Sequence, residues 1–150
     1  MVTVAKITVP MPRMLRAALW SVFAALWGSG CAWLVLHFGF ATRTPFGPLP
    51  NPWEATVLEI HGLLAVAAVF LVGWIFGSHV LERWAAGRNR KSGLMLGVSA
   101  AVLIVSGYML YYTTDRLQAG AAACHEIVGV LGAVFAIAHW RYRDLMSRGR

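Results

Sequence analysis

The sequence is poor in charged residues and in the short motifs that identify many soluble enzymes. Only 13% of its 150 residues are charged, and six of them are acidic. Its two cysteines do not form a CxxC or CxxCH motif. A covalent c-type haem in its usual form, an iron–sulfur cluster and a cysteine-bound structural zinc are therefore excluded. A glycine-rich phosphate-binding loop is also missing.

Apolar residues are abundant instead and make up 59% of the chain. They form four long runs, at residues 15–40, 53–81, 93–112 and 120–140. Each run reaches the roughly 20 residues that an α-helix needs to cross a hydrocarbon core about 30 Å thick. A soluble core in so short a chain would not hide four helices that are apolar all round. The sequence therefore predicts an all-α, integral membrane four-helix bundle, a single domain over residues 1–150 in contact with membrane lipid.

The basic residues follow the loops. Eleven of the 13 lysines and arginines lie before the first run, between the second and third, or after the fourth. Only Arg43 and Arg116 lie on the other side. The positive-inside rule then places both termini in the cytoplasm of a multi-pass protein of the bacterial inner membrane. Topology explains the basic surplus better than nucleic-acid binding does, and we expect no nucleic-acid partner.

The segments between the runs are short. Residues 41–52 contain four prolines and are predicted to be extended and ordered rather than helical. The other connections, at residues 82–92 and 113–119, are shorter. We therefore expect any chemistry to take place within the bilayer or at its surfaces. Cys31 and Cys124 either pair in an oxidising periplasm or remain two small buried apolar residues, and the pattern favours the second.

Histidines stand out within the apolar runs, because ionisable groups inside a membrane are costly and usually functional. His61 and His79 are 18 residues apart on the second run, which is five whole helical turns. His125 and His139 are 14 apart on the fourth run, about 40° out of phase. The two helices run in the same direction, so each level of the membrane receives two facing imidazoles. This arrangement predicts two irons held by axial histidines in porphyrins, about 21 Å apart along the fourth helix.

Small residues on the same helical faces would give a flat macrocycle room to approach the backbone. Close helix–helix packing is the alternative explanation for them. These groove positions are Ala65, Ala68 and Val72 on the second run, and Gly129, Gly132 and Ala136 on the fourth.

With these features the chain resembles bacterial four-helix di-haem b-type cytochromes. The resemblance runs from Thr44 to Arg141 through PFGPLPNPWE, LEIHG, GSHVLERW, an inner basic loop followed by SG, SGYMLYY, and CHEIVG…AHW. The chain is similar to the cytochrome b subunits of nickel–iron hydrogenases and formate dehydrogenases, and to small bacterial members of that superfamily. The resemblance implies haem b bound by two histidines and electron transfer, without naming a substrate.

The spacing of 18 on the second run departs from the family spacing of about 14 and adds about 6 Å along the axis. The second helix must tilt, the outer haem must lie obliquely, or His37 must replace His61 as the outer ligand. The face that His61 shares with His79 favours His61. His37 would then serve a quinone site or a haem propionate, or be a plain interfacial histidine.

Haem propionates need cationic or hydrogen-bonding partners near the surface. The candidates are Arg43 and Arg116 on the outer side and Arg83 and Arg141 on the inner side, although each also suits a topology anchor. Glu59 and Glu126 flank outer histidines. They either take part in proton release from a quinol or face lipid headgroups, and the second is the simpler interpretation.

The leading hypothesis is a transmembrane di-haem b-type cytochrome that carries electrons between the quinone pool and a redox partner. It would act as a membrane anchor subunit for a periplasmic or membrane redox protein, or as a stand-alone quinone-linked oxidoreductase. The alternative is a histidine-lined metal or proton transporter. That alternative would favour polar residues along the path, whereas the faces between the histidines are apolar.

Overall fold

The computed structural model describes residues 12–45, 47–85 and 90–148. Four long helices dominate it: α1 (Arg13–Gly39), α2 (Trp53–Ile75), α4 (Arg90–Tyr112) and α5 (Asp115–Arg148). The remaining elements are β1 (Thr42–Thr44), β2 (Gly47–Leu49), a π-helical segment η1 (Phe76–Val80) and α3 (Leu81–Ala85). All four long helices are apolar and long enough to cross a membrane. The prediction of a multi-pass membrane protein built on four helices is confirmed.

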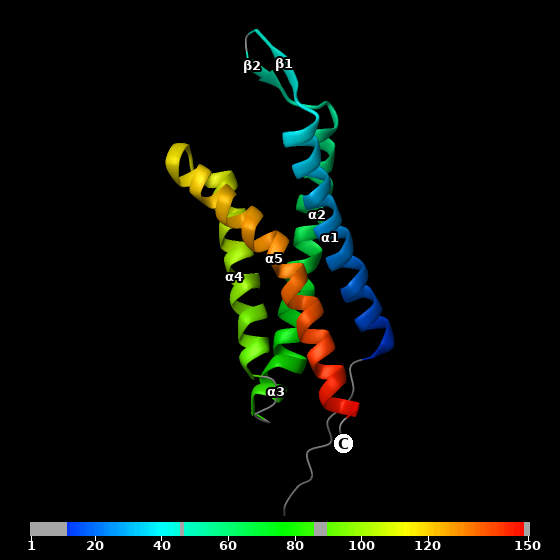
Figure 1. Cartoon of the computed structure of the whole chain (residues 1–150). Helices are drawn as coiled ribbons and strands as arrows, with labels where there is room; N and C mark the ends of the chain where they lie inside the picture. Colours follow the sequence, from blue (N-terminus) through cyan, green and yellow to red (C-terminus); the bar gives the residue numbers. More distant parts are fainter. Residues whose placement is uncertain (1–11, 46, 86–89, 149–150) are drawn as a thin grey trace, which may run out of the picture.

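The helices pack as two antiparallel hairpins, α1 with α2 and α4 with α5 (Figure 1). Between the hairpins, the most extensive packing joins α1 and α5. The start of α1, the short α3 and the end of α5 lie at one end of the bundle, which we call the α3 end (Figure 1). The strands and the α4–α5 turn lie at the other, which we call the strand end. His61 and His125, which we call the outer level, therefore lie towards the strand end. His79 and His139, which we call the inner level, lie towards the α3 end.

The bundle has almost no core of its own. Within the described residues the only buried apolar side chains are Ala68 and Ala121, and no large side chain is fully buried. Large apolar side chains cover the outside instead, among them Leu63 at 74% and Val66 at 70% exposure. Such a surface is stable in lipid, where helices associate through small residues that let their backbones approach closely.

The proline-rich segment after α1 forms a small antiparallel hairpin, which confirms that it is extended rather than helical. Thr42 pairs with Leu49, and Thr44 pairs with Gly47. Gly47 has a φ of 113°, a conformation that costs little only for glycine. The hairpin connects α1 to α2 and leaves the two helices side by side (Figure 1).

The predicted bounds of the second and fourth helices are wrong. The sequence predicts the fourth helix at residues 120–140, but α5 runs from Asp115 to Arg148, so the connection after α4 is only two residues long. Asp115 makes this sharp turn with a φ of 54°, in the left-handed region that aspartate tolerates. The second helix was expected to be regular to residue 81, but a π-helix replaces its last turn at Phe76–Val80. His79 lies in this wider turn, so a uniform step of 100° per residue no longer relates it to His61.

Candidate functional site: a pair of histidines between two helical hairpins

His61 on α2 and His125 on α5 face each other across the gap between the hairpins. Their ring centroids are 6.3 Å apart, and the ring planes cross at 79°. Two imidazoles bound on opposite sides of one metal ion, at about 2.0–2.1 Å per bond, have centroids roughly 6–6.5 Å apart. The two rings are therefore spaced as axial ligands of a single ion would be. Of the two candidates for the outer ligand, His61 and not His37 is opposite His125.

The hydrogen bonds of His61 fix which ring nitrogen carries the proton. Its Nδ1 lies 3.1 Å from the carbonyl oxygen of Leu26 and 3.0 Å from the hydroxyl oxygen of Ser29, both on α1. A carbonyl oxygen only accepts, so Nδ1 must donate. Nε2 therefore keeps its lone pair, the state in which a neutral imidazole binds metal.

His125 is held in the same way by the other hairpin. Its Nδ1 lies 2.9 Å from the hydroxyl oxygen of Ser106 on α4. That hydroxyl donates its own proton to the carbonyl oxygen of Val102 at 2.7 Å, so it accepts from Nδ1. Ser106 is only 4% exposed, and a buried hydroxyl in apolar surroundings is costly unless it is bonded. The Nε2 of His125 is thus also left for a ligand.

A glycine makes room for each of these rings. A β-carbon on Gly30 would lie 3.1 Å from the Cε1 atom of His61, and one on Gly107 would lie 3.2 Å from the Cε1 atom of His125. In both hairpins the first helix therefore supplies a serine that bonds the histidine and, next to it, a glycine that the ring lies against. Sequence reasoning missed these partners. The available signal was a Ser-Gly dipeptide, which occurs at Ser29–Gly30, Ser92–Gly93 and Ser106–Gly107.

The third Ser-Gly dipeptide belongs to the inner level. The Nδ1 of His139 lies 2.9 Å from the hydroxyl oxygen of Ser92, at the start of α4. A hollow of about 210 Å³ lies beside them, lined also by Met95, Phe135 and Ala138. The backbone of His79 lies in η1, but its side chain falls outside the described residues. The pairing of His79 with His139 therefore stays a prediction.

The small residues of the predicted groove differ in their surroundings. Ala68 is buried on α2, and Ala65 and Ala136 are half-buried. β-Carbons on Gly129 and Gly132 would meet the side chain of Leu103 on α4, at 3.8 and 4.0 Å. These two glycines therefore serve the packing of α4 against α5, the alternative considered for them.

The predicted propionate partners are dispersed. Arg116 lines an open apolar pocket of about 500 Å³ between α4 and α5, together with Ser106, Met109 and Leu117. Arg141 is exposed on α5, two residues after His139. Arg43 lies on β1 and Arg83 on α3, and both side chains fall outside the described residues. The cysteines Cys31 and Cys124 are both free, so the predicted alternative of a disulfide is not formed. The favoured alternative of two buried residues is also wrong, because Cys31 is half-buried and Cys124 is exposed.

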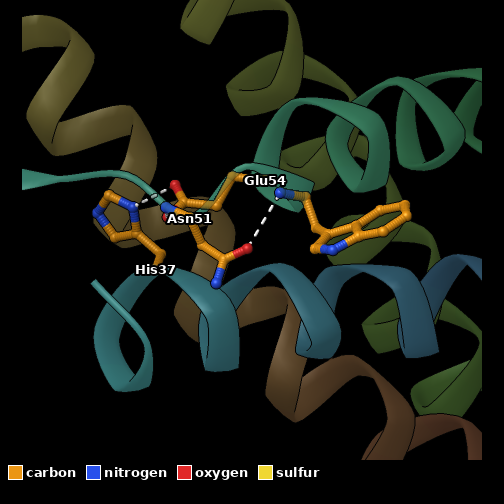
Figure 2. A network of polar contacts seen from close by, with 4 residues as sticks. His37, Asn51 and Glu54 are labelled. Atoms are coloured by element: carbon orange, nitrogen blue, oxygen red, sulfur yellow. Dashed lines mark hydrogen bonds and ion pairs between the residues drawn. The ribbon is translucent and has the colours of Figure 1, made fainter. Parts of the chain in front are cut away.

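His37 belongs to a separate polar network at the strand end (Figure 2). Its Nδ1 lies 2.9 Å from Oε2 of Glu54, in the first turn of α2. Oε1 of Glu54 accepts the backbone N–H of Asn51 at 2.8 Å, and Oδ1 of Asn51 accepts the backbone N–H of Trp53 at 3.0 Å. These reciprocal bonds form an arrangement like a capping box at the start of α2, and Pro52 directly precedes the first residue of the helix. Glu54 was not considered from the sequence, although the pattern Asn-Pro-Trp-Glu was available.

The donor set suits one kind of metal group better than a bare ion. Within the part of the chain that the structure describes, no three His, Cys, Asp or Glu side chains gather to hold a metal. A porphyrin supplies four nitrogens itself, so two opposed imidazoles complete its iron. No protein-family model, no curated protein and no solved structure matches the chain.

Proposed function

We propose that the chain is a transmembrane di-haem b-type cytochrome that carries electrons between the quinone pool and a redox partner. In this proposal His61 and His125 hold one haem b, and His79 and His139 hold the second. The single observation that supports it most strongly is the spacing of 6.3 Å between two rings whose Nδ1 atoms are both hydrogen-bonded to the preceding helix, so that each Nε2 is left for a ligand.

The residues around the outer pair would orient and protect its ligands. The carbonyl of Leu26 and the hydroxyls of Ser29 and Ser106 accept the Nδ1 protons and fix the rotation of each ring. Such outer partners set the tautomer and raise the basicity of a metal-binding imidazole. The haem, when bound, supplies a reversible one-electron centre. The apolar helices around the site exclude water and so favour electron transfer over side reactions.

Charge supports the proposed orientation. Arg13 and Arg16 open α1, Arg90 and Lys91 open α4, and Arg141 lies on the last part of α5, so all five belong to the α3 end. The positive-inside rule then assigns the α3 end and both termini to the cytoplasm of a bacterial inner membrane. A quinone would reach the site through lipid. A periplasmic or membrane redox protein would exchange electrons with the chain, as a partner subunit or as a separate protein. Membership of the four-helix di-haem cytochrome b superfamily is part of this proposal.

The decisive experiment counts haem in protein purified from haem-replete cells. A pyridine haemochrome assay should give two haem b per chain, and a colourless protein would overturn the proposal. His61→Ala should remove one haem. His37→Ala is the matched control and should keep both, because His37 is bonded to Glu54 and not opposed to His125. The reverse result would move the outer ligand to His37.

A further inference from the structure

His37 and Glu54 form a second pair of interacting ionisable side chains, within the α1–α2 hairpin. His37 lies eight residues beyond Ser29, the serine bonded to His61, which is about 12 Å along α1. Glu54 lies seven residues before His61, which is about 10 Å along α2. The pair therefore lies between the outer histidine level and the strand end.

The bonds of Glu54 determine what His37 can do. Glu54 is only 8% exposed, and both of its oxygens are in use. Oε1 accepts the backbone N–H of Asn51, and Oε2 faces Nδ1 of His37 at 2.9 Å. The start of α2 also favours a negative charge at this position. A carboxylate accepts, so Nδ1 donates to it, and in the neutral imidazole Nε2 carries the lone pair.

The second ring nitrogen of His37 is directed away from Glu54 (Figure 2). The His37 side chain is 43% exposed, whereas the Glu54 side chain is only 10% exposed. The ring stacks on Trp33 at 4.6 Å with planes 12° apart, and the edge of Phe38 approaches it at 4.9 Å. A fixed proton acceptor is thus presented at the surface of the bundle in an aromatic setting, which suits a flat aromatic molecule with a hydroxyl group.

We propose that His37, oriented by Glu54, is the proton acceptor for a quinol that delivers electrons to the outer haem. This inference rests on the proposed function. When the quinol O–H bond breaks, its proton moves to Nε2 of His37. A haem held by His61 and His125 would supply the acceptor for the one electron that the quinol gives up. A second round takes the second proton and electron and leaves the quinone. The imidazolium releases each proton to water at the strand end. His37 touches the substrate, and Glu54 is a positioning residue.

The sharpest variant is Glu54→Gln. Glutamine also serves in a capping box, so its Oε1 keeps the bond to Asn51 and α2 keeps its start. Its amide group then faces His37 and donates to Nδ1. The ring proton moves to Nε2, which can no longer accept. Loss of a general base typically costs 10²–10⁴-fold, so quinol-driven haem reduction should slow by about 100-fold or more. Thr56→Val, a change of similar size at an exposed residue of the same helix, is the matched control and should leave the rate unchanged.

Binding is measured separately from turnover. With both haems first reduced by dithionite, no electron can move, and equilibrium dialysis reports the affinity for a short-chain benzoquinol. Loss of one hydrogen bond to the quinol should weaken binding by about 2- to 10-fold in Glu54→Gln and in His37→Ala. Added imidazole should restore part of the reduction rate in His37→Ala, because the position is open to the surface.

The outcomes separate the two proposals. A protein without haem overturns the proposed function itself. Haem-loaded variants that benzoquinol reduces at the unaltered rate overturn only the role of His37. Slow variants with unaltered quinol affinity and no rescue by imidazole also overturn it, because they reveal a structural role for the pair.

Discussion

The two ends of the bundle hold their histidines in different ways. At the outer level His61 and His125 lie on regular α-helices, and each ring is bonded by a serine and lies against a glycine of the preceding helix. At the inner level His139 is bonded to Ser92 in the first turn of α4, and His79 lies in a π-helical turn. The outer level is thus built from two regular helices, whereas the inner level combines a wide π-helical turn with the start of a helix.

This difference bears on the unequal histidine spacing of the two helices. A π-helix has more residues per turn than an α-helix and so advances less per residue. The turn Phe76–Val80 therefore shortens the distance that the 18-residue interval spans along α2. The change from α-helix to π-helix is confined to the region of His79, and the part of α2 around His61 remains a regular α-helix. π-Helical turns are frequent at functional sites for this kind of reason.

Removing one ligand from each level gives the largest expected effect. His125→Ala should abolish one haem and leave the other spectroscopically unchanged, and His139→Ala should do the converse. Haem stoichiometry and the low-temperature α-band of the reduced protein report both. If either substitution removes both haems at once, the two levels are not independent and the comparison fails.

The second-largest effect is expected from loss of the buried hydroxyl of Ser106. Ser106→Ala removes the hydroxyl that accepts the Nδ1–H of His125, and loss of such an outer partner typically costs about 10- to 100-fold in metal affinity. Haem titration of the apoprotein measures it. Ser99→Ala is the matched control on the same helix, because its hydroxyl bonds only to the carbonyl of Met95. Equal affinities for the two variants would show that the bond to His125 is unimportant.

A smaller effect on haem affinity is expected where a substitution only fills the space beside a histidine ring. Gly107→Ala places a methyl group 3.2 Å from Cε1 of His125, and the ring must shift by a few tenths of an ångström. Overpacking of this kind costs about 1 kcal/mol or somewhat more. Gly97→Ala on the same helix has nothing within 4 Å and should be silent. The readout is haem affinity together with the electron paramagnetic resonance of the ferric haem, which responds to ligand-ring orientation.

The smallest effect tests the inner level. Ser92→Ala should weaken the inner haem by less than the factor found for Ser106→Ala, because Ser92 is half-buried in the first turn of α4. Near the membrane boundary, water can replace the lost hydroxyl. Stepwise haem titration resolves the two sites. A loss as large as that at Ser106 would show that both levels are equally closed to water.

The sequence was sufficient to predict the four spans and the pairing of His61 with His125, because both depend on helical periodicity and on the number of membrane crossings. The serines were missed since Ser29 and Ser106 lie 32 and 19 residues from their histidines. Only the rotation of each hairpin's helices about their axes brings such distant residues together. The same rotation turns Gly129 towards Leu103. The π-helix at His79 could not be inferred by counting at 3.6 residues per turn.

The scarcity of packing between the hairpins has a consequence for biogenesis. Each hairpin carries its own turn and its own close helix–helix contact. Little apolar surface is buried between the hairpins, because Ala68 and Ala121 are the largest apolar side chains buried among the described residues. Each hairpin is therefore a natural unit of insertion by the translocon, and the two halves meet afterwards in the bilayer. A chain divided in the connection between α3 and α4 should insert as two pieces. Their reunion then becomes the committed step of maturation, and the histidines from opposite halves are the groups that a joining ligand would bridge.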